Sequence, residues 1–171
     1  MNKNNSQSSS SDLISLNKWD HRFMSIAFAV ASWSSCLRHH VAAVIVKDNH
    51  ILATGYNGAP SGIKSCHDRK ECIRNTLEIP SSQQAQICYA IHAEQNAILQ
   101  AARLGVSLEG TTIYCTHKPC SLCTKCIINA GISRIVYAHQ YSDSFVDTLL
   151  ENAEIQNLIK IERIVNYETF N

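Results

Sequence analysis

Two short motifs carry residue types that can bind a metal and move protons. His92-Ala93-Glu94 stands at one expected helix start, and Pro119-Cys120-Ser121-Leu122-Cys123 stands at another. Cys120 and Cys123 are three residues apart, so both sulfurs are expected on one helix face, where the helix dipole favours thiolate. With His92 they make three ligands for zinc, which prefers four. The open position would hold water, whose pKa zinc lowers toward neutrality.

Glu94 is the candidate proton-transfer group beside this zinc. His92 and Glu94 would lie about 200° apart on an ideal helix, so both can face one metal only if His92 occupies the frayed first position. Without that histidine and glutamate, the two cysteines would fit a structural zinc knuckle or a redox pair as well. Cys115 and Cys126 are expected to be small buried side chains, because a third thiolate would close the site against water.

The elements that hold these motifs follow from hydrophobic periodicity and turn residues. Residues 1–16 are polar and Asn/Ser-rich, which predicts a disordered tail before a single domain over 17–171. Helices are expected at 19–36, 91–104, 119–130 and 144–153, and strands at 41–46, 51–56, 111–116, 134–138 and 159–165. This order predicts an α/β protein with three α-β-α layers around a mixed five-stranded sheet.

The polar segment 63–88 lacks a clear period and is long for a structureless loop in a compact domain. We predict that a second zinc orders it, bound by Cys36, Cys66, Cys72 and Cys88, with His67 as the alternative ligand. A four-thiolate zinc site supplies folding free energy directly. The competing interpretation is a set of unlinked thiols in a loose loop.

Composition excludes several classes of function. The 171 residues are 45% hydrophobic and 17% charged, with a net charge of +1, so no general electrostatic attraction to nucleic acid or an anionic membrane is expected. No apolar run reaches ~18 residues, which argues against a membrane span. The first residues contain no apolar secretory segment. Clustered cysteines in such a chain favour metal or thiol chemistry in the cytoplasm over a disulfide framework.

The motifs lie within a longer resemblance over about residues 19–165. Segments 41–48, Ala53-Thr54-Gly55-Tyr56-Asn57-Gly58, 92–98 and 127–132 resemble the deoxycytidylate (dCMP) deaminase family, including bacterial late-competence operon deaminases. The H-x-E and P-C-x-x-C pair is the signature of zinc nucleobase deaminases. The resemblance implies a cytidine deaminase-like fold and hydrolytic deamination of dCMP to dUMP, with Glu94 moving protons. Ala42 stands where the family usually has glycine, so a packing adjustment is expected.

The resemblance also implies a regulated homohexamer that responds to dCTP and dTTP, with Arg103 in a regulatory or subunit contact. Asn57 would contact the sugar, although Asn before Gly is also ordinary turn chemistry. Arg38 would meet the phosphate, or be a solvated surface arginine. Tyr141 would lie against the substrate or in the core. His117 is expected in the wall of the site.

Two other classes of function remain open. One is a different deaminase of the superfamily, acting on adenosine in tRNA, on guanine or on a nucleoside. The even charge argues against a tRNA enzyme, and the cysteine-bearing insertion fits the dCMP branch better. The other is a non-catalytic zinc-binding regulatory protein, against which the intact Glu94 argues.

Overall fold

The computed structural model describes residues 17–81, 83–155 and 157–165, so the expected tail at 1–16 lies outside the described residues. Five strands and their connecting helices follow one another along the chain. In order they are α1 (Lys18–Ala31), β1 (Ala42–Lys47), β2 (His50–Tyr56), α2 (Cys66–Arg69), α3 (Ile73–Thr76), the 3-10 helix η1 (Ala85–Ile87), α4 (Ala93–Leu104), β3 (Thr112–His117), α5 (Ser121–Asn129), β4 (Arg134–His139), α6 (Ser144–Ile155) and β5 (Lys160–Arg163).

The strands form one mixed sheet in the order β2-β1-β3-β4-β5. β1 runs antiparallel to both β2 and β3, whereas β3, β4 and β5 are parallel to one another. Parallel neighbours need a crossover connection, and α5 and α6 supply the two that are required. The predicted mixed five-stranded sheet is therefore confirmed.

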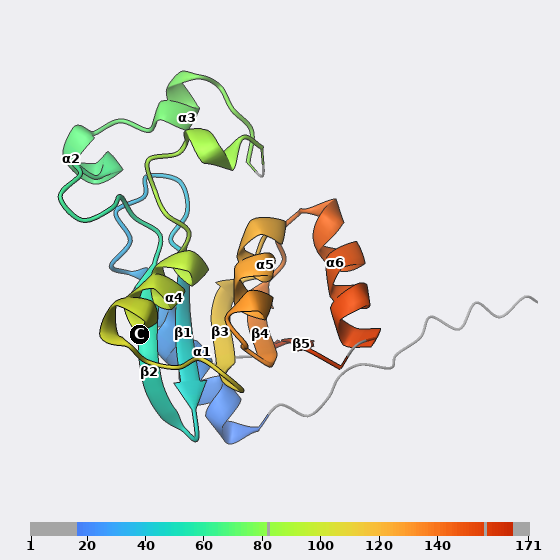
Figure 1. The fold of residues 1–171 in the computed structure, drawn as a ribbon. Coiled ribbons are helices and arrows are strands. Elements are labelled where there is room, and N and C mark those ends of the chain that lie inside the picture. Colours follow the sequence, from blue (N-terminus) through green and yellow to red (C-terminus); the bar gives the residue numbers. More distant parts are fainter. Residues whose placement is uncertain (1–16, 82, 156, 166–171) are drawn as a thin grey trace, which may run out of the picture.

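Helices cover both faces of this sheet. Along β1, Ala42, Val44 and Val46 pack in the cluster that contains α1, and the alternating residues Ala43 and Ile45 pack in the cluster of α4 and α5. Figure 1 shows α4 and α5 in front of the strands and α1 behind them. The strand is thus buried on both faces, as its continuous apolar run indicates, and the predicted α-β-α layering is confirmed.

The first helix is shorter than its apolar periodicity predicts. It ends at Ala31 rather than Cys36, and the hydroxyls of Ser32 and Ser34 bond to the carbonyl oxygens of Ala29 and Asn57. Serine offers the backbone these local alternatives to a helical bond. Trp33 follows the end of the helix and is 62% exposed. Cys36 consequently lies in the loop before β1.

Asp20 links the start of α1 to the sheet. It completes a capping box with Asn17, and its buried carboxylate accepts hydrogen bonds from Arg134 (2.6 Å) and the Tyr114 hydroxyl (2.8 Å). Burial alone would raise the pKa of Asp20, but the hydrogen bonds from Arg134, Tyr114 and the Asn17 backbone lower it. The carboxylate is therefore ionised at neutral pH, where it both caps α1 and stabilises the contact between this helix and the sheet.

Segment 63–88 contains the short helices α2 and α3, which stand beyond the ends of the strands (Figure 1). Ser65 and Asp68 form a capping box at α2. The His67 N–H donates to the Ser35 carbonyl (3.2 Å), which ties the segment to the loop after α1. Among the described residues no helix is long and apolar enough to cross a membrane.

Candidate active site

Two helix starts on the same face of the sheet bring the motifs together. His92 is the N-cap of α4, and Cys120 is the N-cap of α5; both have extended backbones. The expectation that His92 occupies the frayed first position is confirmed. Pro119 was expected to open its helix, and this is wrong: α5 begins at Ser121, whose N–H donates to the Asp143 carboxylate (2.8 Å). Cys120 therefore precedes the helix and Cys123 lies in its first turn.

The ligand atoms of His92, Cys120 and Cys123 all lie within 4.8 Å of one another. The Nδ1 atom of His92 is 3.4 Å from Cys120 Sγ and 3.3 Å from Cys123 Sγ. Tetrahedral zinc with ordinary Zn–N and Zn–S bonds would separate such atoms by about 3.6 Å. The side chains thus fit zinc with only a small expansion. Within the described ranges, no other three such residues meet the same distance condition.

The hydrogen bond between Cys120 and Cys123 shifts the pKa values of their thiols in opposite directions. Hydrogen bonds with Cys123 and then His92 lower the pKa of Cys120 to about 4 against the effect of burial. The same contact with Cys120, together with burial, raises the pKa of Cys123. One sulfur of the pair is thus a ready thiolate ligand, because the thiolate is the metal-binding form.

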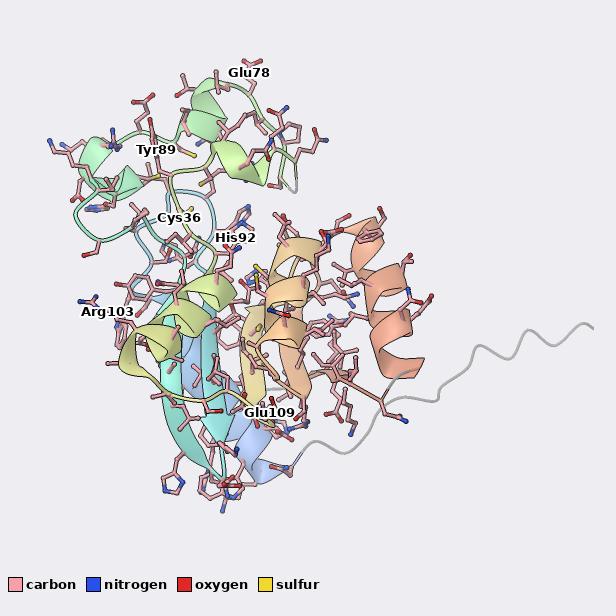
Figure 2. The ribbon with its side chains drawn as sticks, viewed as in Figure 1. Cys36, Glu78, Tyr89, His92, Arg103 and Glu109 are labelled. Carbon is pink, nitrogen blue, oxygen red and sulfur yellow. The ribbon has the colours of Figure 1, made fainter. Side chains whose placement is uncertain are left out.

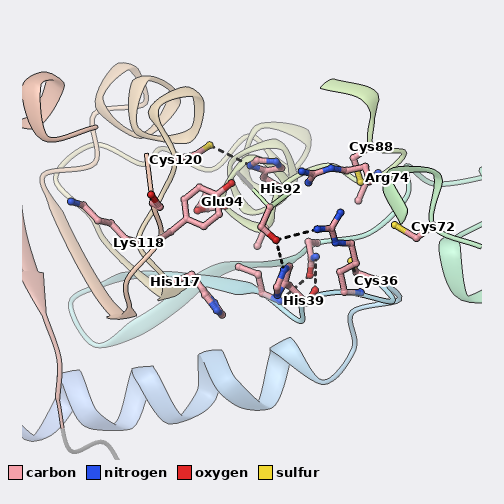
Figure 3. A pocket seen from close by; sticks show the side chains of 18 of the residues that line it. Cys36, His39, Cys72, Arg74, Cys88, His92, Glu94, His117, Lys118 and Cys120 are labelled. Carbon is pink, nitrogen blue, oxygen red and sulfur yellow. Dashed lines mark hydrogen bonds between the residues drawn. The ribbon is translucent and has the colours of Figure 1, made fainter. Parts of the chain in front are cut away.

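Glu94 lies in the first turn of α4 and is only 4% exposed. Figure 3 shows its side chain beside His92 and Cys120. Burial raises the pKa of Glu94, while the neighbouring His92 opposes the shift. A dication held by the three ligands would also favour the ionised form. The carboxyl group therefore holds a proton more readily than an exposed glutamate does, which suits a group that passes protons.

The remaining two cysteines near this site behave differently from each other. Cys115 in β3 is fully buried, and burial raises the pKa of its thiol well above the ordinary value. This matches the expected inert core side chain. Cys126 was also expected in the core, but it is exposed. Three residues beyond Cys123 along α5, it lies on the solvent side because Thr124 and Ile127 take the buried positions.

A cavity of about 330 Å³ is lined by His92, Cys120 and Glu94, whereas Cys123 is buried beneath its wall. That volume is within the usual range for small-molecule sites. His117 lines the cavity, as expected for a wall residue. The cavity is also lined by the three residues expected to contact the substrate, Arg38, Asn57 and Tyr141. Arg103 does not line it; this exposed residue lies in the last turn of α4 and points away from His92 (Figure 2).

The Asn57 side chain uses most of its hydrogen-bonding capacity to hold the loop between α1 and β1. Its Oδ1 accepts hydrogen bonds from the Ser34 hydroxyl (2.6 Å) and the Val41 N–H (2.9 Å), and its Nδ2 donates to the His39 carbonyl (2.8 Å). A carboxamide has two N–H donors and two lone pairs on oxygen. One N–H is therefore left for a ligand, so the scaffold role and a substrate contact are compatible.

Sequence reasoning missed three polar residues that surround Arg38 in the cavity. Arg38 donates to the Ile79 carbonyl (3.0 Å) and the Ser81 hydroxyl (3.1 Å), and His39 also contacts that hydroxyl (3.3 Å). Arg74 enters from α3. Glu94 is the one carboxylate among the described residues that line the cavity. Its mouth is therefore basic. Sequence periodicity could not show this, because the contacts that position these side chains join residues about forty positions apart.

The four cysteines predicted as a second zinc site all line the same cavity, but among the described residues no three of their sulfurs lie within 4.8 Å of one another. Burial raises the pKa of the Cys66 thiol, and the charges of Cys88, Cys36 and Cys72 raise it further. Backbone N–H groups donate to two of the sulfurs, from Arg38 to Cys36 (3.4 Å) and from Ala90 to Cys88 (3.5 Å). His67 is exposed and is not in the lining.

A His-Cys-Cys ligand set at two helix starts, with a buried glutamate beside it, defines a zinc-dependent nucleobase deaminase site. Residues 17–139 match the family model described as the cytidine and deoxycytidylate deaminase zinc-binding region. The chain belongs to this family, which confirms the resemblance seen in the motifs.

Known relatives cover most of the chain. The deoxycytidylate deaminase of Mycobacterium phage D29 is 42% identical, over 70% of this chain and 93% of the relative. ComE operon protein 2 of Bacillus subtilis is 38% identical, over 80% and 68%. The crystal structure of a dCMP deaminase from cyanophage S-TIM5, in complex with dCMP and dUMP, matches with a TM-score of 0.65 at 32% identity, over 84% and 94%. The chain spans less than half the length of two fungal relatives, 46% and 43%.

Proposed function

We propose that this protein catalyses the zinc-dependent hydrolytic deamination of dCMP to dUMP with release of ammonia. The observation that carries the proposal is the position of a three-ligand metal set and Glu94 at the base of a nucleotide-sized cavity with a basic mouth. The family match and the relatives named deoxycytidylate deaminase support the choice of substrate.

The residues divide the reaction among themselves. Zinc held by His92, Cys120 and Cys123 would supply hydroxide by lowering the pKa of a coordinated water. Oxygen from water bonds to carbon 4 of the pyrimidine, and the bond from carbon 4 to the amino nitrogen breaks. Glu94 accepts the proton from water, protonates ring nitrogen 3 and delivers a proton to the departing ammonia. Its burial keeps bulk water from competing for these protons.

The basic mouth supports a monophosphate over a nucleoside. Arg38 donates two hydrogen bonds, to the Ile79 carbonyl and the Ser81 hydroxyl, and these orient its guanidinium group. Its other N–H groups remain available to bind a phosphate. The remaining Asn57 N–H would contact the sugar, and Tyr141 would lie against the bound nucleotide. Deoxycytidine should therefore be a poorer substrate than dCMP, and Arg38→Gln should remove much of that difference by raising KM for dCMP alone.

Ammonia release from dCMP, deoxycytidine, cytidine and guanine, measured side by side, tests the proposal. Glu94→Gln should keep zinc and lose about 10²–10⁴-fold in turnover. Glu109→Gln is the matched control, since Glu109 is exposed at the opposite end of the sheet (Figure 2). A better substrate among the other three, or a Glu94→Gln protein with zinc and normal turnover, would contradict the assignment.

A second, structural zinc at Cys36, Cys66, Cys72 and Cys88 is also proposed. It is supported by the position of all four cysteines in the lining of one cavity, although no three of their sulfurs are as close together as the ligand atoms of His92, Cys120 and Cys123. Zinc binding requires the sulfurs to approach to about 3.8 Å from one another, which is the sulfur–sulfur distance when four thiolates surround zinc tetrahedrally. Metal analysis that finds two zinc ions per chain supports the site, and one zinc with four freely titrating thiols refutes it.

The proposal extends to assembly and location. A cytoplasmic homohexamer regulated by dCTP and dTTP, with Arg103 at a regulatory or subunit contact, rests on the family resemblance. Exposure of Arg103 and of Leu99 and Leu104 on the same helix leaves that surface available for such a contact. Cooperative dCMP kinetics that respond to the two triphosphates would support this part of the proposal.

A further inference from the structure

Asp143 joins the starts of two neighbouring helices. β3 and β4 are parallel, so α5 and α6, which follow them, both begin at the edge of the sheet where those strands end, and the two helices lie side by side (Figure 1). The Oδ2 atom of Asp143 accepts a hydrogen bond from the Ser121 N–H (2.8 Å), and its Oδ1 atom accepts one from the Phe145 N–H (3.1 Å). One carboxylate therefore caps α6 and also holds the first residue of α5.

The bond between Asp143 and Ser121 connects two parts of the candidate site. Ser121 directly follows Cys120 and precedes Cys123 by two residues, so it belongs to the turn that carries two of the three metal ligands. Tyr141, two residues before Asp143, lines the cavity. The bond thus links the ligand turn to the loop that we expect to lie against the nucleotide.

The N–H groups of the first turn of α5 are divided between this carboxylate and a metal ligand. The Cys123 N–H donates to the Cys120 sulfur, whereas the Ser121 N–H donates to Asp143. Burial raises the pKa of Asp143, but hydrogen bonds from the N–H and hydroxyl of Ser121 and from the Phe145 N–H lower it. The carboxylate is therefore an anion at neutral pH, and the start of a helix stabilises an anion.

We infer that Asp143 is a positioning residue of the candidate active site, whose carboxylate fixes the ligand turn of α5 relative to the loop that carries Tyr141. An aspartate before a helix is an ordinary N-cap, but a cap needs bonds only to its own helix. The bond to Ser121 crosses 22 positions to a different helix. The inference rests on the proposed function, because it gives this bond a part in zinc and substrate binding.

Two substitutions break this bond and leave both helices able to form. Asp143→Ser keeps a good N-cap for α6, but its shorter side chain cannot reach Ser121. Ser121→Pro removes the N–H itself, at the first helical position, where proline is favoured; the extended backbone of Cys120 (ψ 169°) suits a residue before proline. Because both changes remove the same bond, their effects should not add in the double variant. Glu151→Gln is the control, since it removes an exposed carboxylate from the same helix.

The test measures zinc binding without substrate, by competition with a chromophoric chelator. His92→Ala identifies the zinc dissociation constant of this site. Asp143→Ser and Ser121→Pro should each raise that constant by about 10–100-fold, the usual effect of losing a group that orients metal ligands. With zinc in excess, KM for dCMP should rise while kcat stays near the wild-type value, because His92 and Glu94 belong to α4.

Zinc affinity equal to wild type in both single variants, or losses that add in the double variant, would overturn the inference. A lower Tm with an unchanged zinc constant would also overturn it, since a purely structural cap predicts that result. A protein whose zinc affinity depends on this bond but which releases no ammonia from dCMP would support the inference and refute the proposed function.

Discussion

Gly55 offers a direct test of how the sheet positions His92 and Glu94, the proposed metal ligand and proton-transfer group on α4. It lies in β2 opposite Ala43, and α4 packs against it. A Cβ atom at this position would lie 2.9 Å from the Cα atom of Ala97, and closer still to the Ala93 oxygen and the Ala97 nitrogen. Those two atoms belong to the backbone of α4, so no side chain can rotate away to make room.

Gly55→Ala must therefore move the helix. Ordinary contacts of a Cβ atom begin near 3.4 Å, so α4 has to retreat by at least about 0.5 Å. His92 and Glu94 flank Ala93 and would move with it, whereas Cys120 and Cys123 belong to α5. Overpacking of this kind costs about 1–3 kcal/mol, which corresponds to about 2–12 °C in Tm for a chain of this size. A displacement approaching 1 Å costs up to about 10²-fold in rate.

The assay combines kcat for dCMP, zinc content and thermal unfolding. Gly58→Ala is the matched control, because a Cβ atom there would meet the Ser35 hydroxyl oxygen at an ordinary 3.5 Å. Gly55→Ala is expected to lower kcat, zinc occupancy and Tm together, while Gly58→Ala changes them little. A Gly55→Ala protein with wild-type kcat and full zinc would show that the helix start is not held by this contact, and the account of site assembly would be wrong.

Three further outcomes are expected. Asp20→Asn should lower the free energy of unfolding at pH 7 by about 3 kcal/mol in chemical denaturation, because it breaks a buried ion pair. The folded pKa of Asp20 lies below its unfolded value, so this stabilisation is complete above about pH 4 and the difference from wild type should vanish as the pH falls through the folded pKa; a constant difference down to pH 2 would refute the assignment. Removal of metal by a chelator should abolish ammonia release, and zinc should restore it. Light scattering should show a hexamer, and a monomer with and without triphosphates would contradict that expectation.

Periodicity predicted the sheet and its covering helices because β1 is buried on both faces and α4 carries a regular apolar stripe. The errors lie where side-chain hydrogen bonds compete with helical ones. Ser32 and Ser34 end α1 before Cys36, and the Asp143 carboxylate helps place the start of α5 after Cys120. Such contacts join residues up to 23 positions apart. Helix propensity depends only on neighbouring residues, so it cannot predict them. Cys126 is exposed for a different reason: its expected burial rested on residue type alone, and the buried face of α5 is formed by Cys123, Thr124 and Ile127.

The grouping of His92, Cys120 and Cys123 could be predicted because each motif places its residues at a single helix start. The cavity mouth could not, because Arg38, Asn57 and Arg74 meet partners on loops with no shared period. Asn57 illustrates the difference. Its position before a glycine predicted a turn or a sugar contact, yet three of its four hydrogen-bonding positions hold the loop before β1. Replacing Asn57 would therefore disturb the position of Arg38 as well as any sugar contact, and its effect on KM alone cannot identify a substrate ligand. The deoxycytidine comparison with Arg38→Gln avoids this coupling, because Arg38 reaches the cavity without supporting the catalytic helix starts.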